Sequence, residues 1–428
     1  MLTSLFTAVS GMNANGTALS VIGDNVANMN TTGFKASRAA FGDILSQQLG
    51  ESQVGRGVLL TSVKPEFTQG TFENTASVLD LALDGDGFFI MKDNSGTYYG
   101  RAGQFDVDKE GYVVNPSGNR LQGYTFSATG ASTSSLGDIN ISSINSAPSD
   151  TQTVTINANL DSRLTIPAAF DVTDPNNTSS FSTSVTVYDT LGNGHIVNVY
   201  FRKDTETATG NGWEWFAVVD GGDSSSGNTE IQAQGTIDFT NNGELDVESA
   251  VTYNLASGGF DFNGGAAAGQ VIDFDFGTSI TTDGGTGLDG TTQFGAPSNT
   301  SFQNQDGYSS GSLKSITIST DGIMTGIFTN GQTRGIAQIV LAKFVSPTGL
   351  TKMGKGLYAE SAESGQPLIS TPGNSGTGTV LSNTLELSNV DLAEEFVKMI
   401  LSQRGFQANS RVISASDELM VELVNLKR

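Results

Sequence analysis

Two acidic residues on a glycine turn are the first candidates for chemistry in this sequence. The segment 84–87 reads Asp-Gly-Asp-Gly and resembles the start of a calcium loop, because closely spaced carboxylates supply the oxygen ligands that a hard cation prefers. The twelve-residue calcium pattern then fails, since Phe88 and Phe89 stand where further oxygen ligands are required. The segment therefore predicts a hairpin turn and no metal site.

A glycine-rich segment is the second candidate. Gly285, Gly287 and Gly290 have the G-x-G-x-x-G spacing that lets backbone N–H groups approach a pyrophosphate at the start of a helix. Asp283 and Asp289 flank these glycines and would repel phosphate, and neither a preceding strand nor a following helix is convincing. We expect no nucleotide or other cofactor here.

Histidine and cysteine chemistry is almost absent from the chain. The sequence holds one histidine, His195, and no cysteine, which excludes thiolate nucleophiles, disulfides and clusters of histidine ligands. A Ser-His-Asp triad stays open, because its members converge in space, but no G-x-S-x-G elbow accompanies the histidine. His195 follows a probable hairpin tip at 191–194, so we expect a solvent-exposed turn residue. The sequence predicts no catalytic residue and no enzyme.

The elements that dominate the sequence are amphipathic stretches at its two ends. The N-terminal stretch carries apolar or small residues in an alternation of three and four, which is the pattern of a coiled-coil seam. Gly16 and Gly23 on this seam suggest close helix approach, because each costs roughly 1 kcal/mol against Ala. The apolar residues that we assign to an assembly interface are Leu2, Leu5, Val9, Met12, Leu19 and Val26.

The C-terminal stretch has the same pattern and opens at Ser388 or Asn389 as N-cap, with Asp391 in the first turn. Its polar seam positions, Gln403, Ser410 and Asp417, either specify register or face solvent. Neither stretch can bury its apolar stripe alone, so each must pack on the other, on neighbouring copies, or on both. The assembly residues on this side are Phe396, Met399, Phe406, Ile413, Met420 and Leu423.

Between these ends the sequence reads as β structure, after a possible short helix over 34–49. Alternating runs such as 88–91 and 213–219 are separated by Asn, Asp, Gly and Pro turns. We predict an α+β fold in which the terminal helices pack as a coiled-coil-like pair and two mainly antiparallel β domains are nested between them. The expected parts are a terminal helical domain that forms an inner tube (1–34 and 388–428), connecting segments (35–70 and 365–387), a first β domain (71–145 and 311–364) and an inserted acidic outer β domain (146–310).

The charge of the chain is unevenly distributed. The net charge is −23, and residues 146–310 hold 21 acidic and three basic residues, a net charge of −18. Nucleic acid is excluded as a partner, because phosphate neutralisation needs clustered Lys and Arg. The acidity favours a solvated outer surface over an acidic binding site. No apolar run is long enough to span a membrane, and residues 1–34 lack the basic leader of a signal peptide, so we expect an uncleaved helix at the N-terminus.

Three stretches carry a likeness to a known family. Residues 25–35, 80–105 and 385–418 resemble, in this order, the N-terminal, first β and C-terminal signatures of the bacterial flagellar rod and hook family. The likeness covers residues 1 to about 125 and about 330 to 428. The signature residues are Asn25, Asn28, Gly33, Phe34, Lys35, Ser388, Asn389, Gln403, Arg404 and Asn409.

The resemblance implies a structural subunit of the bacterial flagellum. Short rod members look like the portions of this chain on either side of the insert, without the insert itself. The acidic insert therefore points to a hook-forming member, which polymerises into a flexible helical tube and transmits torque from rod to filament. A distal rod or hook-associated axial protein is the alternative. The resemblance also implies type III export without a cleaved signal, an extracellular location, and contacts with copies of itself, with rod, hook-cap and hook–filament junction proteins and with the export apparatus.

A rival from another class is a secreted acidic β-rich adhesin or calcium-binding module, suggested by the Asp and Gly content. It predicts a calcium-dependent melting temperature and no need for the terminal helices.

Overall fold

The chain forms two compact units in the computed structural model, which describes residues 2–45, 55–127, 132–142, 144–207 and 210–425. The chain leaves unit 1, builds unit 2 and returns to unit 1, and the expected insert at 146–310 falls within unit 2. Unit 1 holds Met1–Ile144, Leu313–Ile327 and Thr333–Arg428, and unit 2 holds Asn145–Ser312 and Phe328–Gln332.

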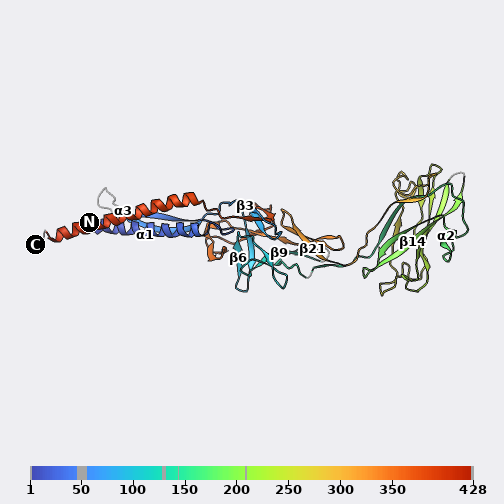
Figure 1. Ribbon diagram of the computed structural model, residues 1–428, viewed down its shortest axis with the longest axis horizontal. Coiled ribbons are helices and arrows are strands. Elements are labelled where there is room, and N and C mark those ends of the chain that lie inside the picture. The colour runs from blue at the N-terminus through green and yellow to red at the C-terminus, as the bar shows by residue number, and fades with distance from the viewer. Residues whose placement is uncertain (1, 46–54, 128–131, 143, 208–209, 426–428) are drawn as a thin grey trace. The chain divides into compact units, whose positions relative to one another are not determined.

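Two long helices belong to unit 1, α1 (Leu2–Ala27) and α3 (Leu392–Asn425), and they lie side by side (Figure 1). Helix α3 is capped by Asp391, whose Oδ1 accepts the N–H groups of Ala393 at 2.8 Å and Glu394 at 3.1 Å. The expected cap at Ser388 or Asn389 is therefore wrong, because the carboxylate that reaches the first-turn amides comes two residues later. Within the described residues, no helix has the length and apolarity that crossing a bilayer requires.

A β-hairpin follows α1, made of β1 (Ser37–Leu45) and β2 (Gly55–Pro65) in antiparallel register, with Ser37 opposite Pro65. The short helix that we expected over 34–49 is wrong for the described part, 34–45. Its apolar spacing resembled a helical face, but pairing with β2 decides the conformation, and a local window does not contain β2. Residues 46–49 of that expectation lie outside the described residues.

The rest of unit 1 is β-sheet with a short 3₁₀ helix, η1 (Pro347–Gly349). The main sheet runs in the order β21-β22-β23-β9-β5-β6-β26-β25, with β10, β7, β8, β24 and β27 attached; β28 pairs with β4, and β29 with β3. The strands are β3 (Phe72–Asn74), β4 (Leu81–Asp84), β5 (Phe88–Lys92), β6 (Thr97–Gly100), β7 (Asp106–Val107), β8 (Val113–Val114), β9 (Arg120–Phe126), β10 (Ser132–Asp138), β21 (Gly311–Ile318), β22 (Ile323–Phe328), β23 (Thr333–Ile339), β24 (Leu341–Lys343), β25 (Thr351–Gly354), β26 (Leu357–Ala359), β27 (Leu368–Ser370), β28 (Thr379–Ser382) and β29 (Thr384–Glu386).

Two apolar clusters fill unit 1. One gathers around Leu81, Phe89 and Leu121, and the other around Phe88, Tyr99 and Phe344. Phe88 and Phe89 thus point to different clusters, as alternation along β5 requires.

Unit 2 is built from two sheets, of order β13-β14-β15-β16-β17 with β18 attached, and β19-β12-β20. Its core gathers around the buried Trp213 and Trp215. The turns expected at 191–194 and 241–243 are confirmed, since Tyr188 pairs with Gly194 and Phe239 with Leu245. The elements are β11 (Asn145–Ser146), β12 (Thr153–Asn159), α2 (Pro175–Thr178), β13 (Phe181–Tyr188), β14 (Gly194–Glu206), β15 (Asn211–Val219), β16 (Glu230–Phe239), β17 (Leu245–Glu248), β18 (Thr252–Tyr253), β19 (Asp273–Asp275) and β20 (Asn299–Gln305). The predicted α+β class, with helices at both ends of a mainly β chain, is confirmed.

Candidate assembly interface

Asn25 ties three segments of unit 1 together near the end of α1. Its side chain is 2% exposed. The Nδ2 group donates to the Ser37 carbonyl at 2.9 Å, and Oδ1 accepts the Ser37 N–H at 2.8 Å, as a neighbouring strand would. The same Nδ2 donates to Glu395 Oε2 at 3.2 Å. One amide therefore joins α1, the start of β1 and the first turn of α3.

Asn389 makes the corresponding connection from the C-terminal side. Its Oδ1 accepts the Ala36 N–H at 2.7 Å, and its Nδ2 donates to the Glu66 carbonyl and to Thr68 Oγ1, both at 2.8 Å. These partners stand on both arms of the hairpin base. Asn389 is thus a connector between the hairpin and the segment that leads into α3.

A buried ion cluster lies beside these two asparagines. The Lys35 ammonium donates to Glu386 Oε1 at 2.6 Å and to the Thr68 carbonyl at 2.7 Å, and the side chains of Lys35 and Glu386 are 0% exposed. Burial lowers the pKa of Lys35, and the charge of Glu386 opposes that shift. The Arg101 Nη1 lies 3.6 Å from Glu386 Oε2. Removing one partner of such a buried pair costs about 3–5 kcal/mol.

Gly33 brings its backbone into the same junction. Its φ is +67°, and a Cβ there would lie 2.5 Å from the Ala102 backbone nitrogen, so only glycine fits. Its N–H donates to the Glu386 carbonyl at 2.7 Å. Asn25, Gly33, Lys35 and Asn389, far apart in sequence, thus meet at one junction.

The remaining signature residues have separate surroundings. The Asn28 side chain donates to the Asp24 carbonyl at 2.9 Å. The Lys352 Nζ lies over the Phe34 ring, 5.3 Å from the ring centre. Ser388 Oγ accepts the Val390 N–H at 3.3 Å. Gln403 and Arg404 are exposed on α3.

The two long helices approach closely where glycines face asparagines. A Cβ added at Gly11 would lie 2.8 Å from Asn409 Nδ2, and one added at Gly405 would lie 2.8 Å from Asn15 Oδ1. The contacting residue on α1 advances from 11 to 15 while the contacting residue on α3 goes back from 409 to 405, so the two helices are antiparallel. Gly16 and Gly23 have nothing within 4 Å of an added Cβ. The close approach that we expected at these two glycines is therefore wrong for contacts within this chain.

Small and polar side chains dominate the buried face of the helix pair. Among the described side chains, those buried on α1 are Ala8, Ile22 and Asn25, and those on α3 are Glu395 and Ser416. Each of these buried residues immediately precedes a residue of the predicted seam in the sequence. One residue corresponds to a rotation of about 100° around the helix axis, so the buried face and the predicted stripe are different faces of the helix. The stripes therefore do not provide the buried contact between α1 and α3.

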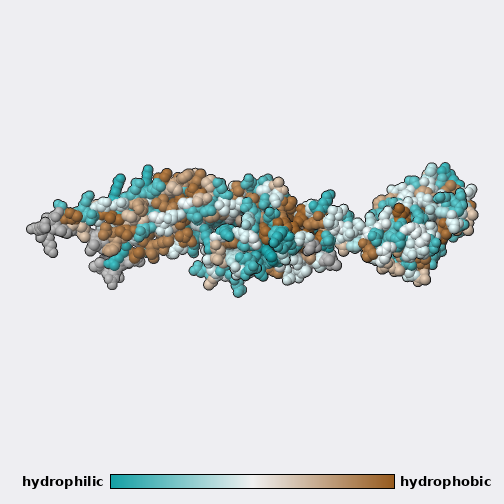
Figure 2. All heavy atoms as spheres, turned by 60° about the horizontal axis from the view of Figure 1, so that its bottom comes forward, coloured by the Kyte–Doolittle hydropathy of each residue, from teal (hydrophilic) through white to brown (hydrophobic). Residues whose placement is uncertain are grey.

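The predicted assembly residues are half-buried or exposed wherever their side chains are described. Val9 is 40% exposed, Phe396 47% and Phe406 38%. Figure 2 shows hydrophobic residues, in brown, gathered over the part of unit 1 that carries the helices. The half-buried residues are Leu5, Met12, Leu19, Val26, Met399 and Ile413; the exposed ones are Val9, Phe396, Phe406 and Met420; the side chains of Leu2 and Leu423 lie outside the described set.

Sequence reasoning missed the apolar surface of the hairpin. Phe41, Leu59, Leu60 and Val63 of β1 and β2 are all more than a third exposed. The consecutive apolar residues Val58, Leu59 and Leu60 were the available signal. The exposed apolar surface of unit 1 thus includes the hairpin as well as the helices, and surfaces of this kind mark interaction sites.

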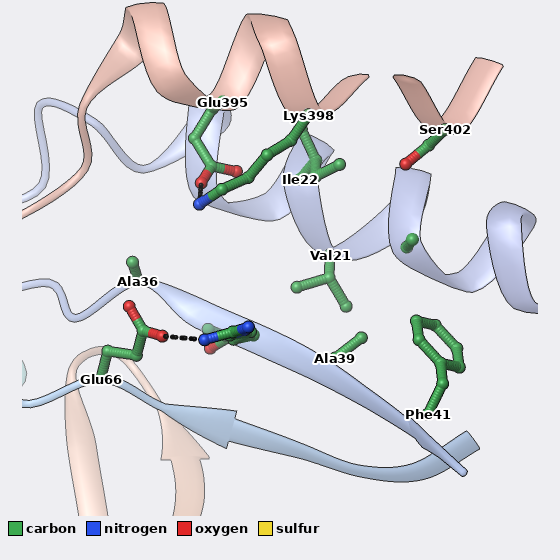
Figure 3. Close-up of a pocket in the computed structure, with 12 residues that line it drawn as sticks. Val21, Ile22, Ala36, Ala39, Phe41, Glu66, Glu395, Lys398 and Ser402 are labelled. Atoms are coloured by element: carbon green, nitrogen blue, oxygen red, sulfur yellow. Dashed lines mark hydrogen bonds and ion pairs between the residues drawn. The ribbon is translucent and has the colours of Figure 1, made fainter. Parts of the chain in front are cut away.

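A pocket of about 270 Å³ opens between α1, α3 and β1 (Figure 3). Val21 of α1 and Phe41 of β1 supply apolar lining. At the other side Lys398 Nζ pairs with Glu395 Oε1 at 2.9 Å, and Glu66 of the hairpin base lies at the rim. The pocket adds a concave site with apolar and charged lining to the exposed surface.

His195, the candidate for acid–base chemistry, lies in unit 2. His195 is 3% exposed, so the expected exposed turn histidine is wrong. It is the second residue of β14, its Nε2 lies 3.0 Å from Asp189 Oδ2, and its ring stacks on Phe262 at 4.4 Å. The neighbouring turn 191–194 folds the ring into the core of unit 2, which the turn residues alone could not show.

The two glycine-rich segments are loops. The 84–87 turn joins β4 to β5, but β4 pairs with β28 and β5 with β6, so the expected hairpin is wrong and the turn connects two sheets. No group of three or more His, Cys, Asp or Glu side chains that could hold a metal ion occurs in the described part. Gly285 and Gly287 donate to the Ser279 and Thr278 carbonyls.

Four family models match the chain in succession. They are described as flagella basal body rod protein (residues 5–35), flagellar hook protein FlgE/F/G D1 domain (82–159), flagellar basal body protein FlaE D2 domain (159–308) and flagellar basal body rod FlgEFG protein C-terminal (381–426).

Curated proteins match over the whole chain. The flagellar hook protein FlgE of Borreliella burgdorferi is 34% identical, and that of Treponema pallidum 36%, each over 100% of both chains. The flagellar hook protein FlgE of Salmonella typhimurium is 35% identical over 98% of this chain and 99% of its own.

Proposed function

We propose that this chain, which belongs to the flagellar hook protein family and is a structural subunit of the hook, assembles with copies of itself into a flexible helical tube. The observation that supports the proposal is the exposed apolar surface of α1 and α3, since Val9, Phe396 and Phe406 are each more than a third exposed. Surface of this kind is stabilised by burial, at about 25 cal/mol per Å².

The contact between copies is heterologous. A patch on one copy meets a different patch on the next, and such contacts generate open helices when the rotation does not close. We assign the apolar stripes of the two helices to coiled-coil-like packing among copies, which forms the inner tube. The predicted assembly residues are the core of this contact.

Unit 2 forms the outer part of the tube and contacts solvent. Its excess of acidic residues makes neighbouring copies repel at the exterior. Cohesive inner packing with repulsive outer domains gives a tube that bends and still transmits torque. Rod, hook-cap and junction proteins are its further partners, and type III export without a cleaved signal carries the chain to the outside of the cell.

The hook is a structural assembly, and the family is not an enzyme family. The distal-rod alternative shares the terminal signatures. Residues 159–308 match the FlaE D2 domain, and the relatives named above, which match over nearly the whole chain, are hook proteins.

Electron microscopy of the concentrated protein tests the proposal. We expect tubes from the unaltered chain and none from Val9→Asp or Ile413→Asp, because a buried unpaired charge is costly. Asn13→Asp and Gln407→Glu add the same charge at exposed positions of the same helices and should still form tubes. Unchanged melting of units 1 and 2 in all four variants shows that folding is intact. Tubes from Val9→Asp and Ile413→Asp would show that these stripes are not the contact.

A further inference from the structure

A second pocket of unit 1, of about 210 Å³, lies beside the buried ion cluster. Its charged lining is Arg101, Lys343 and Asp86, and its aromatic lining is Phe67, Phe88 and Phe344. The ring of Phe88 lies edge-on to those of Phe67 at 5.1 Å and Phe344 at 5.8 Å. These contacts fix the aromatic lining around the pocket.

Arg101 is a buried cation with an unpartnered N–H donor. Its side chain is 3% exposed, and its Nε finds no acceptor among the described residues. The carboxylate beside it, Glu386 Oε2, is 3.6 Å from Nη1, which is beyond a normal charge-assisted hydrogen bond. Glu386 Oε2 is itself buried without a hydrogen-bond partner, but one oxygen cannot accept from all five N–H donors of a guanidinium fork, so Arg101 retains donors for a further acceptor.

The cluster also carries an excess of positive charge. Glu386 Oε1 is occupied by Lys35 and by the Gly70 N–H at 2.9 Å. Two buried cations therefore share one carboxylate. Asp86 lines the same pocket, pairs with Lys343 at 3.4 Å and also acts on Arg101, but its side chain is 75% exposed, so water screens its charge. Burial lowers the pKa of the Arg101 guanidinium, and the charge of Glu386 opposes that shift. An incoming anion would lower the cost of keeping both cations buried.

The pocket suits a carboxylate carried on a short apolar stem. Methylene groups would contact the three phenylalanine rings, and the carboxylate would accept from Arg101 and Lys343. The neighbouring Val345 is 95% exposed, so the rim presents an apolar side chain without cover.

We propose that this pocket receives an Asp or Glu side chain from a second copy of the chain. The inference rests on the proposed assembly, which makes copies of this chain the neighbours of each pocket. Charge complementarity favours this occupant, because the chain carries 44 acidic against 21 basic residues and so offers each neighbour many carboxylates.

Zero-length carbodiimide cross-linking of assembled tubes tests the contact. Mixed tubes of ¹⁴N- and ¹⁵N-labelled copies distinguish links between chains from links within one chain. We expect Lys343 to link to a carboxylate of another copy in tubes and not in dilute monomer. The Lys343–Asp86 link within one chain, possible in both states, is the internal control. Tubes that show only this internal link overturn the inference and leave the proposed function standing.

The pocket chemistry is tested separately on dilute monomer, so it is decided even if no tubes form. We expect the Arg101 Nε–H signal in NMR spectra to shift saturably with sodium acetate and not with sodium chloride at the same ionic strength. A signal that does not respond to acetate contradicts the proposal.

A charge reversal links the pocket to assembly. Lys343→Glu should raise the critical concentration for tube formation at least tenfold, and Lys343→Arg should keep it within about twofold. Lys109→Glu is the matched control, since the Lys109 side chain is 88% exposed and pairs only with its neighbour Glu110 among the ion pairs of the described residues. Equal critical concentrations for Lys343→Glu and Lys109→Glu contradict the proposal.

Discussion

At the residue scale, a few buried polar side chains connect the terminal helices with the base of the β1–β2 hairpin and with β29. Asn25, Lys35, Asn389 and Glu386 come from four segments and satisfy one another or nearby backbone groups. Because buried polar groups without partners are costly, each of these contacts depends on the others.

The buried ion cluster gives the first prediction at this scale. Glu386→Gln leaves Lys35 and Arg101 buried without a counter-charge, so we expect the free energy of unfolding of unit 1 to fall by about 3–5 kcal/mol. Urea denaturation followed by circular dichroism measures it. Glu363→Gln, at an exposed position, should change stability by less than about 0.5 kcal/mol. Equal effects of the two substitutions would mean that the cluster contributes nothing.

Glu248 in unit 2 gives a prediction of pH dependence. Burial, followed by the charges of Asp275 and Asp283, raises the pKa of Glu248 from 4.5 to about 7, and its Oε1 has no hydrogen-bond partner. Between pH 4.5 and 7 the folded state then holds a proton that the unfolded state has lost. Unit 2 therefore loses stability as the pH rises from 4.5 to about 7, because the buried Glu248 carboxyl group has to ionise in the folded state.

Glu248→Gln should remove that loss. We expect the variant to be more stable than the unaltered chain at pH 8, by on the order of 1–3 kcal/mol, and similar to it at pH 4. Thermal denaturation of unit 2 at both pH values measures the difference. A variant with the same advantage at pH 4 and pH 8 would show that the carboxyl group does not titrate in this way.

Sequence patterns identified several of these residues and not their contacts. The signature likeness included Asn25, Gly33, Lys35 and Asn389, but Glu386 was only one residue of a matching stretch. No local pattern could show that Lys35 and Glu386, 351 positions apart, form an ion pair. His195 was misread for the same reason, because its burial is set by Asp189 and by Phe262 from a distant loop.

At the element scale, α1 and α3 meet through one face and leave another open. The periodicity of the sequence correctly gave two long terminal helices. It could not show that the buried face would be the small and polar one, because an alternation of three and four is also present there. The spacing of apolar residues over 34–49 likewise failed to predict strand β1, because its partner strand β2 begins only at Gly55.

The two faces of α1 can be tested with matched substitutions of glycine. Gly11→Leu should separate the helices, because even a Cβ there lies 2.8 Å from Asn409 Nδ2, whereas Gly16 has open space. We expect Gly11→Leu to increase hydrogen exchange along α1 and α3 in monomer. Gly16→Leu should leave monomer exchange unchanged and raise the critical concentration for tubes at least tenfold. Increased exchange in both monomers would mean that the open face of α1 is used within the chain.

At the scale of the whole molecule, the chain is two units with separate cores. The bounds predicted for the insert are 146 and 310, and those of unit 2 are 145 and 312, with residues 328–332 in addition. The return of residues 328–332 to unit 2 was not visible in the sequence, because it depends on the pairing of β21 and β22.

Deleting residues 146–310 tests the independence of unit 1. Ser146 pairs with Gly311 in antiparallel register, so a short glycine linker can join the two strands. We expect a soluble, cooperatively melting protein whose fibres are straighter or stiffer than those of the full chain, because the repulsive outer domain is gone. Circular dichroism and the persistence length measured in electron micrographs provide the two readouts. A deletion that fails to fold would contradict the independence of the units.

The double hydrogen bond between Asn25 and Ser37 has a mechanical consequence. Its two bonds, at 2.8 and 2.9 Å, run side by side between the end of α1 and the start of β1. These bonds connect the two segments directly and bypass the loop between them, and both must break before the end of α1 can move away from the start of β1. Strain applied to the helix is thereby delivered to the hairpin instead of being dissipated in the intervening loop.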